Sequence, residues 1–582
     1  MHTDLTNQIL GQPSLDSSVD PSQTSACHYS GTSLVEQLLA DQQQLTAVEQ
    51  FARRHEQGDI PAQAKYYRDL IPAQTPGPNQ QFAFDVDLDR CSGCKACVTA
   101  CHTLNGLDET ETWRDVGLLV GGTSQAPAMQ HVTSACHHCL EPACMIACPV
   151  NAYEKDPLTG IVKHLDDQCF GCKYCTLACP YDVPKYHHNL GIVRKCDMCS
   201  SRLSAGEAPA CVQACPHEAI RIQVVDKDLV AENVEADPFL PAAPDPQITL
   251  PTTTYRTKHA FPRNMLPADY FSVSAEEPHW PLILMLVLTQ LSVGAFAAGL
   301  LLEFLLPAAL WDHVRPIHAT GGLIVGLVAL AASTFHLGRP WLAYRAILGL
   351  RHSWLSREIL AFGLFAGLAA AYAGAVQLLP HVSFITPATL RILAWSVVVA
   401  GAGGIACSAM IYVFTQRDFW SPLQTGVKFM LTTALLGVAS VWLTMLLMAG
   451  LLESPETTAV VQQVGRLTAL LLICLSALKL AWEALLLRHL FARKMTSLKR
   501  SALLITRELS NVSLMRFAAG FLGGVVMPAV LLNAGFTSSA TDSPKFLIAA
   551  LLLVIACLIG ELLERYLYFA AVASPRMPGG IR

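Results

Sequence analysis

Charged residues are scarce in this chain of 582 residues, at 15% of the sequence against 52% hydrophobic residues. An average soluble protein has about 25% charged residues, so the shortage argues against a wholly soluble protein. Basic residues are also in the minority, with 40 Lys and Arg against 45 Asp and Glu. The net charge of -5 provides no overall positive field for a phosphate backbone, and we therefore expect no nucleic-acid partner.

The first residues lack the marks of an export signal. The segment MHTDLTNQILGQPS has neither a basic stretch nor an apolar stretch, and Arg53-Arg54 is followed by polar residues. We therefore expect a reducing compartment, in which crowded cysteines serve as metal ligands rather than disulfides. Residues 1–80 are predicted to be an N-terminal extension with one amphipathic helix, from about 33 to 55, and the isolated Cys27 is interpreted as a free thiol.

Cysteine is the abundant reactive residue, and 17 of the 20 cysteines precede residue 216. Sixteen of them form four groups: Cys91, Cys94, Cys97 and Cys101; Cys136, Cys139, Cys144 and Cys148; Cys169, Cys172, Cys175 and Cys179; Cys196, Cys199, Cys211 and Cys215. Three thiolates of a tight loop can bind one 4Fe-4S cluster while the fourth cysteine points to another cluster. Sixteen ligands therefore predict four 4Fe-4S clusters. Structural zinc is the alternative, but zinc sites usually take two well-separated cysteine pairs.

The cysteine groups lie within one predicted soluble domain, residues 81–226. Short strand-like runs such as QFAFDVDL and AIRIQVV separate the groups. Residues 227–280 are rich in proline and have no period, which predicts an extended linker that wraps a neighbour. The expected fold class is an α+β double ferredoxin-like four-cluster domain, followed by an all-α bundle of eight transmembrane helices.

That bundle is predicted for residues 281–582, where apolar runs are each long enough to cross a bilayer. The eight runs lie at about 281–304, 317–337, 358–379, 391–414, 427–450, 464–487, 514–534 and 545–567. Sixteen Lys and Arg fall on the side of the even-numbered loops and the tail, against four on the opposite side. Because positive residues favour the cytoplasmic side, we expect a multi-pass protein of the cytoplasmic (inner) membrane with its ferredoxin domain in the cytoplasm.

Ionisable residues near the predicted cytoplasmic ends of the spans are candidates for a quinol site, because such residues are costly to place in lipid. We expect His336, Arg339 and Glu358 to take part, since oxidising a quinol needs groups that accept its two protons. Lys479, Glu483 and Glu561 form a second candidate set. Lys479 and Glu483 lie four residues apart, so an internal ion pair is the alternative for them. No two histidines sit at one depth as haem ligands, and no haem is expected.

The cysteine motifs resemble the four-cluster ferredoxin subunit of the dimethyl sulfoxide reductase family of molybdoenzymes. The motifs that carry the resemblance are CSGCKACVTACH, CHHCLEPACMIACP, CFGCKYCTLACPYDVPKY and KCDMCSSRLSAGEAPACVQACP. The resemblance implies four ligand sets: Cys91, Cys94, Cys97 and Cys215 (cluster 1); Cys101, Cys196, Cys199 and Cys211 (cluster 2); Cys136, Cys139, Cys144 and Cys179 (cluster 3); Cys148, Cys169, Cys172 and Cys175 (cluster 4).

The membrane half resembles the haem-free, eight-helix, menaquinol-oxidising anchor subunit of the same family, through FHLGRPWLAYRA, SWLSREI and GELLERYLYF. The resemblance implies that His336 and Glu358 bind quinol, and that a separate subunit holds a molybdopterin cofactor. We therefore expect an electron-transfer and anchor subunit that moves electrons from menaquinol through four clusters to that partner, for reduction of an S- or N-oxide. The reverse direction, sulfite oxidation feeding the quinone pool, is the alternative. A redox-driven ion pump is a second one.

Overall fold

A computed structural model of the protein describes residues 34–43, 46, 48–49, 52–53, 56, 64–236, 239–378, 386–451, 456–536 and 544–579. The chain divides into two units, Met1–Lys65 and Tyr66–Arg582. In the first unit, α1 spans Leu34–Gln43 and coincides with the start of the predicted amphipathic helix. Cys27 and most of the remainder of that helix lie outside the described residues.

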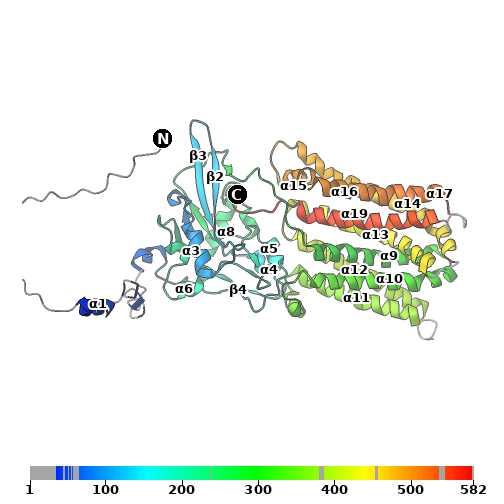
Figure 1. Cartoon of the computed structure of the whole chain (residues 1–582), viewed down its shortest axis with the longest axis horizontal. Helices are drawn as coiled ribbons and strands as arrows, with labels where there is room; N and C mark the ends of the chain where they lie inside the picture. The colour runs from blue at the N-terminus through cyan, green and yellow to red at the C-terminus, as the bar shows by residue number, and fades with distance from the viewer. Residues whose placement is uncertain are drawn as a thin grey trace, which may run out of the picture. The chain divides into compact units, whose positions relative to one another are not determined.

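The described residues of the cysteine-rich part of the second unit form ten strands, of which β2, β3 and β4 are labelled in Figure 1. They are β1 (Gln80–Asp87), β2 (Asp115–Gly122), β3 (Pro127–Ser134), β4 (Tyr153–Lys155), β5 (Val162–His164), β6 (Lys185–His187), β7 (Ile192–Arg194), β8 (Ile220–Asp226), β9 (Thr254–Arg256) and β10 (Leu266–Pro267). They form two three-stranded sheets, β8-β1-β9 and β10-β2-β3, and two hairpins, β4-β5 and β6-β7. Antiparallel pairing of β1 with β8 brings the first cysteine group beside the last, because Cys91 follows β1 and Cys215 precedes β8.

Short helices follow the tight loops, and all of them except Ser200–Ser204 contain cysteines. They are α3 (Ala96–Asn105), α4 (Ala143–Ala147), α5 (Tyr174–Ala178), α6 (Ser200–Ser204) and α7 (Ala210–Gln213). Cys148 and Cys179 directly follow α4 and α5, so each fourth cysteine of these groups leaves its loop at the far end of a helical turn. The structure thus confirms the predicted α+β ferredoxin-like class.

The segment predicted to be an extended linker, 227–280, contains more regular structure than its proline content suggests. It begins with helix α8 (Lys227–Ala236), and its later part supplies β9 and β10. Strand β9 pairs in parallel with β1, and β10 pairs with β2. The segment therefore completes both three-stranded sheets.

In the part of the chain that the structure describes, eight membrane-length apolar helical segments follow, as predicted, and Figure 1 shows them side by side. Their helices are α9 (Trp280–Leu305), α10 (Ala308–Thr334), α11 (Trp354–Leu378), α12 (Pro387–Val413), α13 (Pro422–Leu451), α14 (Glu456–Ala484), α16 (Ser510–Phe521) with α17 (Met527–Ala534), and α19 (Pro544–Ala570). A π-helical segment, Leu522–Val526, joins α16 to α17 within the seventh span, and the shorter α15 (Ser497–Thr506) precedes it. Each span buries apolar side chains and satisfies its backbone internally, which the hydrocarbon interior requires.

Two hydrophobic cores hold the bundle together. One involves α9, α11, α12 and the C-terminal end of α19, and it includes Tyr174 and Ala178 of the ferredoxin domain. The other involves α9, α13, α14 and α19. Helices α9 and α13 approach closely at Gly294 and Gly437, where a Cβ on Gly294 would lie 2.2 Å from the Thr433 carbonyl oxygen. The first core is therefore continuous with the ferredoxin domain, which couples the two halves of the chain mechanically.

Candidate cluster-binding and quinol sites

The structure places cysteine side chains of different motifs close enough to one another to interact electrostatically. Cys91 lies within Coulombic reach of Cys94, Cys97 and Cys215, the set implied for cluster 1. Cys196 is similarly close to Cys101, Cys199 and Cys211 of its own set, and also to Cys136 of the cluster 3 set. Cys144 neighbours Cys136, Cys139 and Cys179, and Cys175 neighbours Cys148, Cys169 and Cys172. Among the described residues, no group of three or more His, Cys, Asp or Glu side chains has an arrangement that could hold a single metal ion.

The surroundings of these sulfurs fit iron–sulfur clusters. Burial raises the pKa of Cys101 to about 12, so its thiolate needs a cation to form. Metal binding deprotonates such thiols, and a bound 4Fe-4S cluster supplies one-electron redox chemistry. Two buried cations, Arg114 and Lys195, also lie among these sulfurs, and neither has a carboxylate within ion-pair distance in the described part of the chain. A buried charge without a counterion is costly, and anionic clusters are the matching counterions.

The loop after α10 lies against the third cysteine motif. The Arg339 backbone N–H donates to the Phe170 carbonyl at 3.0 Å, and its guanidinium donates to the Asp166 carbonyl at 2.8 Å. Gly338 packs so closely on Gly191 that an added Cβ would lie 2.0 Å from the Gly191 carbonyl oxygen. Arg339, predicted as a quinol-site residue, is therefore engaged by ferredoxin backbone carbonyls at this junction.

The start of α11 lies against the second cysteine motif. The Ser353 hydroxyl donates to the Ala147 carbonyl at 2.7 Å, and His352 Nε2 lies 3.0 Å from the Cys148 carbonyl oxygen. The Gly349 N–H donates to the Pro149 carbonyl at 2.9 Å. Cys148 belongs to the cluster 4 set, so this set lies directly on the bundle.

Glu358 is buried one turn further along α11, with 3% of its surface exposed. The Ser408 hydroxyl of α12 donates a hydrogen bond to its carboxylate. Burial, and after it the charge of the nearby Glu358, raises the pKa of Tyr174, whose hydroxyl donates to the Ile411 carbonyl at 3.1 Å. Since Tyr174 stands between Cys172 and Cys175 in sequence, the buried carboxyl group interacts electrostatically with a residue of the cluster 4 motif.

His336 lies in the loop between α10 and Arg339. Its Nδ1 atom is buried and has no hydrogen-bond partner among the described residues. Burial lowers its pKa to about 4 against an opposing hydrogen-bond interaction with the Ser333 backbone, and the nearby His279 and Lys173 add to the lowering. A neutral imidazole with a free ring nitrogen can accept a hydrogen bond or a proton from a hydroxyl group. The candidates His336, Arg339 and Glu358 thus all lie at the junction with the cluster 4 motif.

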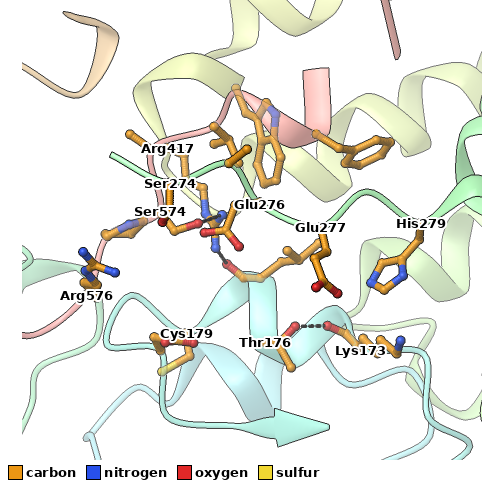
Figure 2. A pocket seen from close by; sticks show the side chains of 18 of the residues that line it. Lys173, Thr176, Cys179, Ser274, Glu276, Glu277, His279, Arg417, Ser574 and Arg576 are labelled. Carbon is orange, nitrogen blue, oxygen red and sulfur yellow. Dashed lines mark hydrogen bonds between the residues drawn. The ribbon is translucent and has the colours of Figure 1, made fainter. Parts of the chain in front are cut away.

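A cavity of about 500 Å³ opens beside this junction. Cys179 and Lys173 lie along one wall, while Glu277 and His279 lie across from Lys173 (Figure 2). Arg417 extends into the same space, with its guanidinium donating to the Ser574 hydroxyl at 2.7 Å. The cavity is also lined by apolar residues of α9 and α19, whereas His336, Arg339 and Glu358 are not among its lining residues.

The second candidate set belongs to a buried ion network in the other part of the bundle. Lys479 pairs with Glu561 rather than with Glu483, and Glu483 pairs with Arg516 at 2.7 Å. Arg516 also reaches Glu561 at 3.1 Å. The alternative of a Lys479–Glu483 pair is therefore wrong in its partners, because residues from α16 and α19 are closer than the neighbouring turn of α14.

The network continues to residues that look like loop charges in the sequence. Lys428, Arg516 and Arg565 are exposed by 7%, 2% and 0%, so they are buried among helices rather than displayed in loops. Lys428 lies 3.5 Å from Glu564, and Arg565 lies 3.6 Å from it. The sequence pointed to Glu561 through its position in an apolar run, but it could not show which cations this carboxylate and the neighbouring Glu564 meet.

Comparison with known proteins agrees with this two-part architecture. Residues 127–225 match the family described as "4Fe-4S dicluster domain", and residues 275–570 match the family described as "DMSO reductase anchor subunit (DmsC)". The chain is thus an iron–sulfur protein joined to a polytopic membrane anchor. It belongs to the DMSO reductase anchor subunit family, which covers half of its length.

Curated relatives match the ferredoxin half. One anaerobic dimethyl sulfoxide reductase chain, from Haemophilus influenzae, is 37% identical over 157 residues, which cover 25% of the present sequence and 76% of the relative. The relative of the same name in Escherichia coli K12 is 35% identical over 155 residues, covering 25% and 75%. "Hydrogenase-2 operon protein HybA" of Escherichia coli O157:H7 is 36% identical over 172 residues, covering 25% and 52%. The fusion of an electron-transfer iron–sulfur subunit with an anchor, predicted from the motifs, is confirmed.

Proposed function

We propose that this chain oxidises menaquinol at the junction of its two halves and passes the electrons through clusters 4, 3, 2 and 1, in that order, to a separate molybdopterin subunit. The observation that carries the proposal is the placement of buried Glu358 beside Tyr174, next to the cluster 4 ligands. The relatives named for anaerobic dimethyl sulfoxide reductase support a partner that reduces an S- or N-oxide. The loop charges support a cytoplasmic ferredoxin domain.

The chemistry at the junction follows from what each side chain can exchange. Oxidising a quinol releases two electrons and two protons, so the site needs an acceptor for the electrons and side chains that accept the protons. Glu358 and the free nitrogen of His336 are groups that accept protons from hydroxyls. Arg339 holds the loop that carries His336 against the ferredoxin domain. His279, whose charge acts on His336, lines the adjoining cavity together with Glu277, and these two residues are the proposed route of the protons to water.

Substitution of Glu358 by Gln tests the proposal. The amide keeps the shape and the hydrogen bond with Ser408 but accepts no proton. We expect Glu358→Gln to retain its full iron content and to lose reduction of the clusters by a menaquinol analogue, while dithionite still reduces them. Glu303→Gln is the matched control, because Glu303 is a carboxylate of another bundle helix, α9, and pairs with the exposed Arg391. Rapid cluster reduction by quinol in Glu358→Gln would refute the assignment.

Purification of the tagged full chain in mild detergent tests the partner and the cofactor count. We expect about sixteen irons per chain and a co-purifying subunit that contains molybdenum. Iron well below this value would contradict four clusters. An accompanying subunit with a twin-arginine signal would contradict the proposed orientation, and an assay of sulfite oxidation against oxide reduction would decide the direction of electron flow.

A further inference from the structure

Two cationic side chains are buried inside the ferredoxin domain, apart from its junction with the helical bundle. Arg114 is 2% exposed and Lys195 is 3% exposed. Neither forms an ion pair with a carboxylate among the residues that the structure describes, and the Asp197 carboxylate interacts with Lys195 only at longer range. Buried cations of this kind need negative charge nearby. The groups around each cation therefore indicate which negative charges it balances.

Arg114 is set between sulfurs of two ligand sets. Its guanidinium donates to the Thr133 hydroxyl at 3.1 Å, and that hydroxyl lies 3.6 Å from the Cys97 sulfur. Because the Thr133 oxygen accepts from Arg114, its own proton is free to point at Cys97. A second guanidinium nitrogen is buried without a partner in the described residues.

The strongest electrostatic partners of Arg114 are cysteines. Although burial opposes its charge, the sulfurs of Cys211, Cys97, Cys196 and Cys101 raise its pKa. Cys97 belongs to the cluster 1 set, and the other three belong to the cluster 2 set. A Phe84 ring 4.6 Å from the guanidinium carbon closes its other side from water. Arg114 thus stands at the boundary between clusters 1 and 2.

Lys195 occupies the corresponding place between the next two sets. Its ammonium group donates to the carbonyls of Val162 and Cys196 and lies 3.7 Å from the Cys136 sulfur. Cys136 belongs to the cluster 3 set, and Cys196 belongs to the cluster 2 set. Lys195 therefore lies between the ligand sets of clusters 2 and 3, as Arg114 lies between those of clusters 1 and 2.

We propose that Arg114 and Lys195 are charge-balancing residues that raise the reduction potentials of the clusters on either side of them, Arg114 those of clusters 1 and 2 and Lys195 those of clusters 2 and 3. The inference rests on the proposed four-cluster function. A fixed positive charge favours the more negative, reduced cluster, and net charge near a cluster is one determinant of its potential. Cluster 4, beside the bundle, is left without either cation and serves as an internal reference.

Redox titration of the purified full-length protein, followed by electron paramagnetic resonance, tests this inference. Arg114→Gln is expected to lower the midpoints of clusters 1 and 2 by at least tenfold in the reduction equilibrium, about 59 mV for a one-electron couple. Lys195→Met is expected to lower those of clusters 2 and 3. Arg114→Lys and Lys195→Arg keep the charge and should restore most of each shift. Lys163→Met is the matched control, because Lys163 is one-third exposed and 3.9 Å from Asp156.

The outcomes separate this inference from the proposed function. Fewer than four clusters in the unaltered protein would refute the four-cluster proposal itself. Four intact clusters with unchanged midpoints, or an equal shift in all four, would refute the role of the two cations. If the neutral variants fail to hold clusters while Arg114→Lys and Lys195→Arg hold them, charge balance is supported through assembly. If the charge-keeping variants fail as well, side-chain shape rather than charge decides and the inference is overturned.

Discussion

The buried ion network offers a prediction that separates a role in stability from a role in quinol chemistry. Lys479 and Glu561 are 0% exposed and paired, and Glu561 shares Arg516 with Glu483. Lys479→Met leaves two carboxylates facing one guanidinium in a place that water does not reach. Removing one partner of a buried pair costs about 3–5 kcal/mol. We expect the bundle to lose that much stability.

The double variant Lys479→Met with Glu561→Gln removes one charge of each sign and leaves the Arg516–Glu483 pair intact. We therefore expect it to recover most of the loss, because no uncompensated charge is left at the pair. The measurement is the apparent unfolding temperature in detergent for the four members of the cycle. At about 2–4 °C per kcal/mol in domains of 150–250 residues, the single variants should fall by roughly 6 °C or more.

Two results would refute this reasoning. If the double variant is as unstable as the two single losses added together, charge balance is not what the pair provides. If the double variant recovers its stability and yet fails to reduce the clusters with quinol, Lys479 and Glu561 belong to a quinol site instead of a structural network. Cluster reduction by quinol is therefore measured on the same four proteins.

Two further predictions concern the junction. Gly338→Ala should slow quinol-driven cluster reduction at full iron content, since the added Cβ would collide with the Gly191 carbonyl. Gly363→Ala is the control and should leave the rate unchanged, because a Cβ there meets nothing within 4 Å. Equal rates in the two variants would contradict the close packing of Gly338 on Gly191. Because burial lowers the pKa of His336 from 6.5 to about 4, the unfolded chain binds more protons between these values, so stability should fall as the pH drops through that window. His336→Gln should flatten this dependence in unfolding temperatures measured against pH, and an unchanged slope would contradict the burial of the imidazole.

The cysteine framework and the eight spans could be predicted because each is a local property of the sequence. A C-x2-C-x2-C loop fixes its ligands within a dozen residues, and a membrane span is an uninterrupted apolar run. The start of α10 was less predictable: the helix begins at Ala308, nine residues before the predicted start at 317. Asp312 and Arg315 look like loop residues in the sequence, but they pair at 2.8 Å on one face of the helix and let it continue.

The charged interior of the bundle could not be predicted, because it depends on partners from different helices. In the sequence, Arg516 and Arg565 cannot be distinguished from arginines in loops. A count of positive loop residues therefore includes them. Only the packing of α14, α16 and α19 shows that Arg516 faces Glu483 and Glu561. The same limit applies to Arg114, which lies 13 residues beyond Cys101 and reaches the clusters only once β2 and β3 have paired.

The two sets of candidate residues therefore differ in what they contact. His336, Arg339 and Glu358 are held by segments that contact the cysteine motifs, through the Phe170, Asp166 and Ala147–Cys148 carbonyls. Lys479, Glu483 and Glu561 are satisfied by one another and by Arg516, so their charges are already used. A proton acceptor must keep a lone pair for its substrate, and the free nitrogen of His336 meets that condition. On this ground electrons should enter the clusters through α11 and its preceding loop, with the ion network fixing the helices behind them.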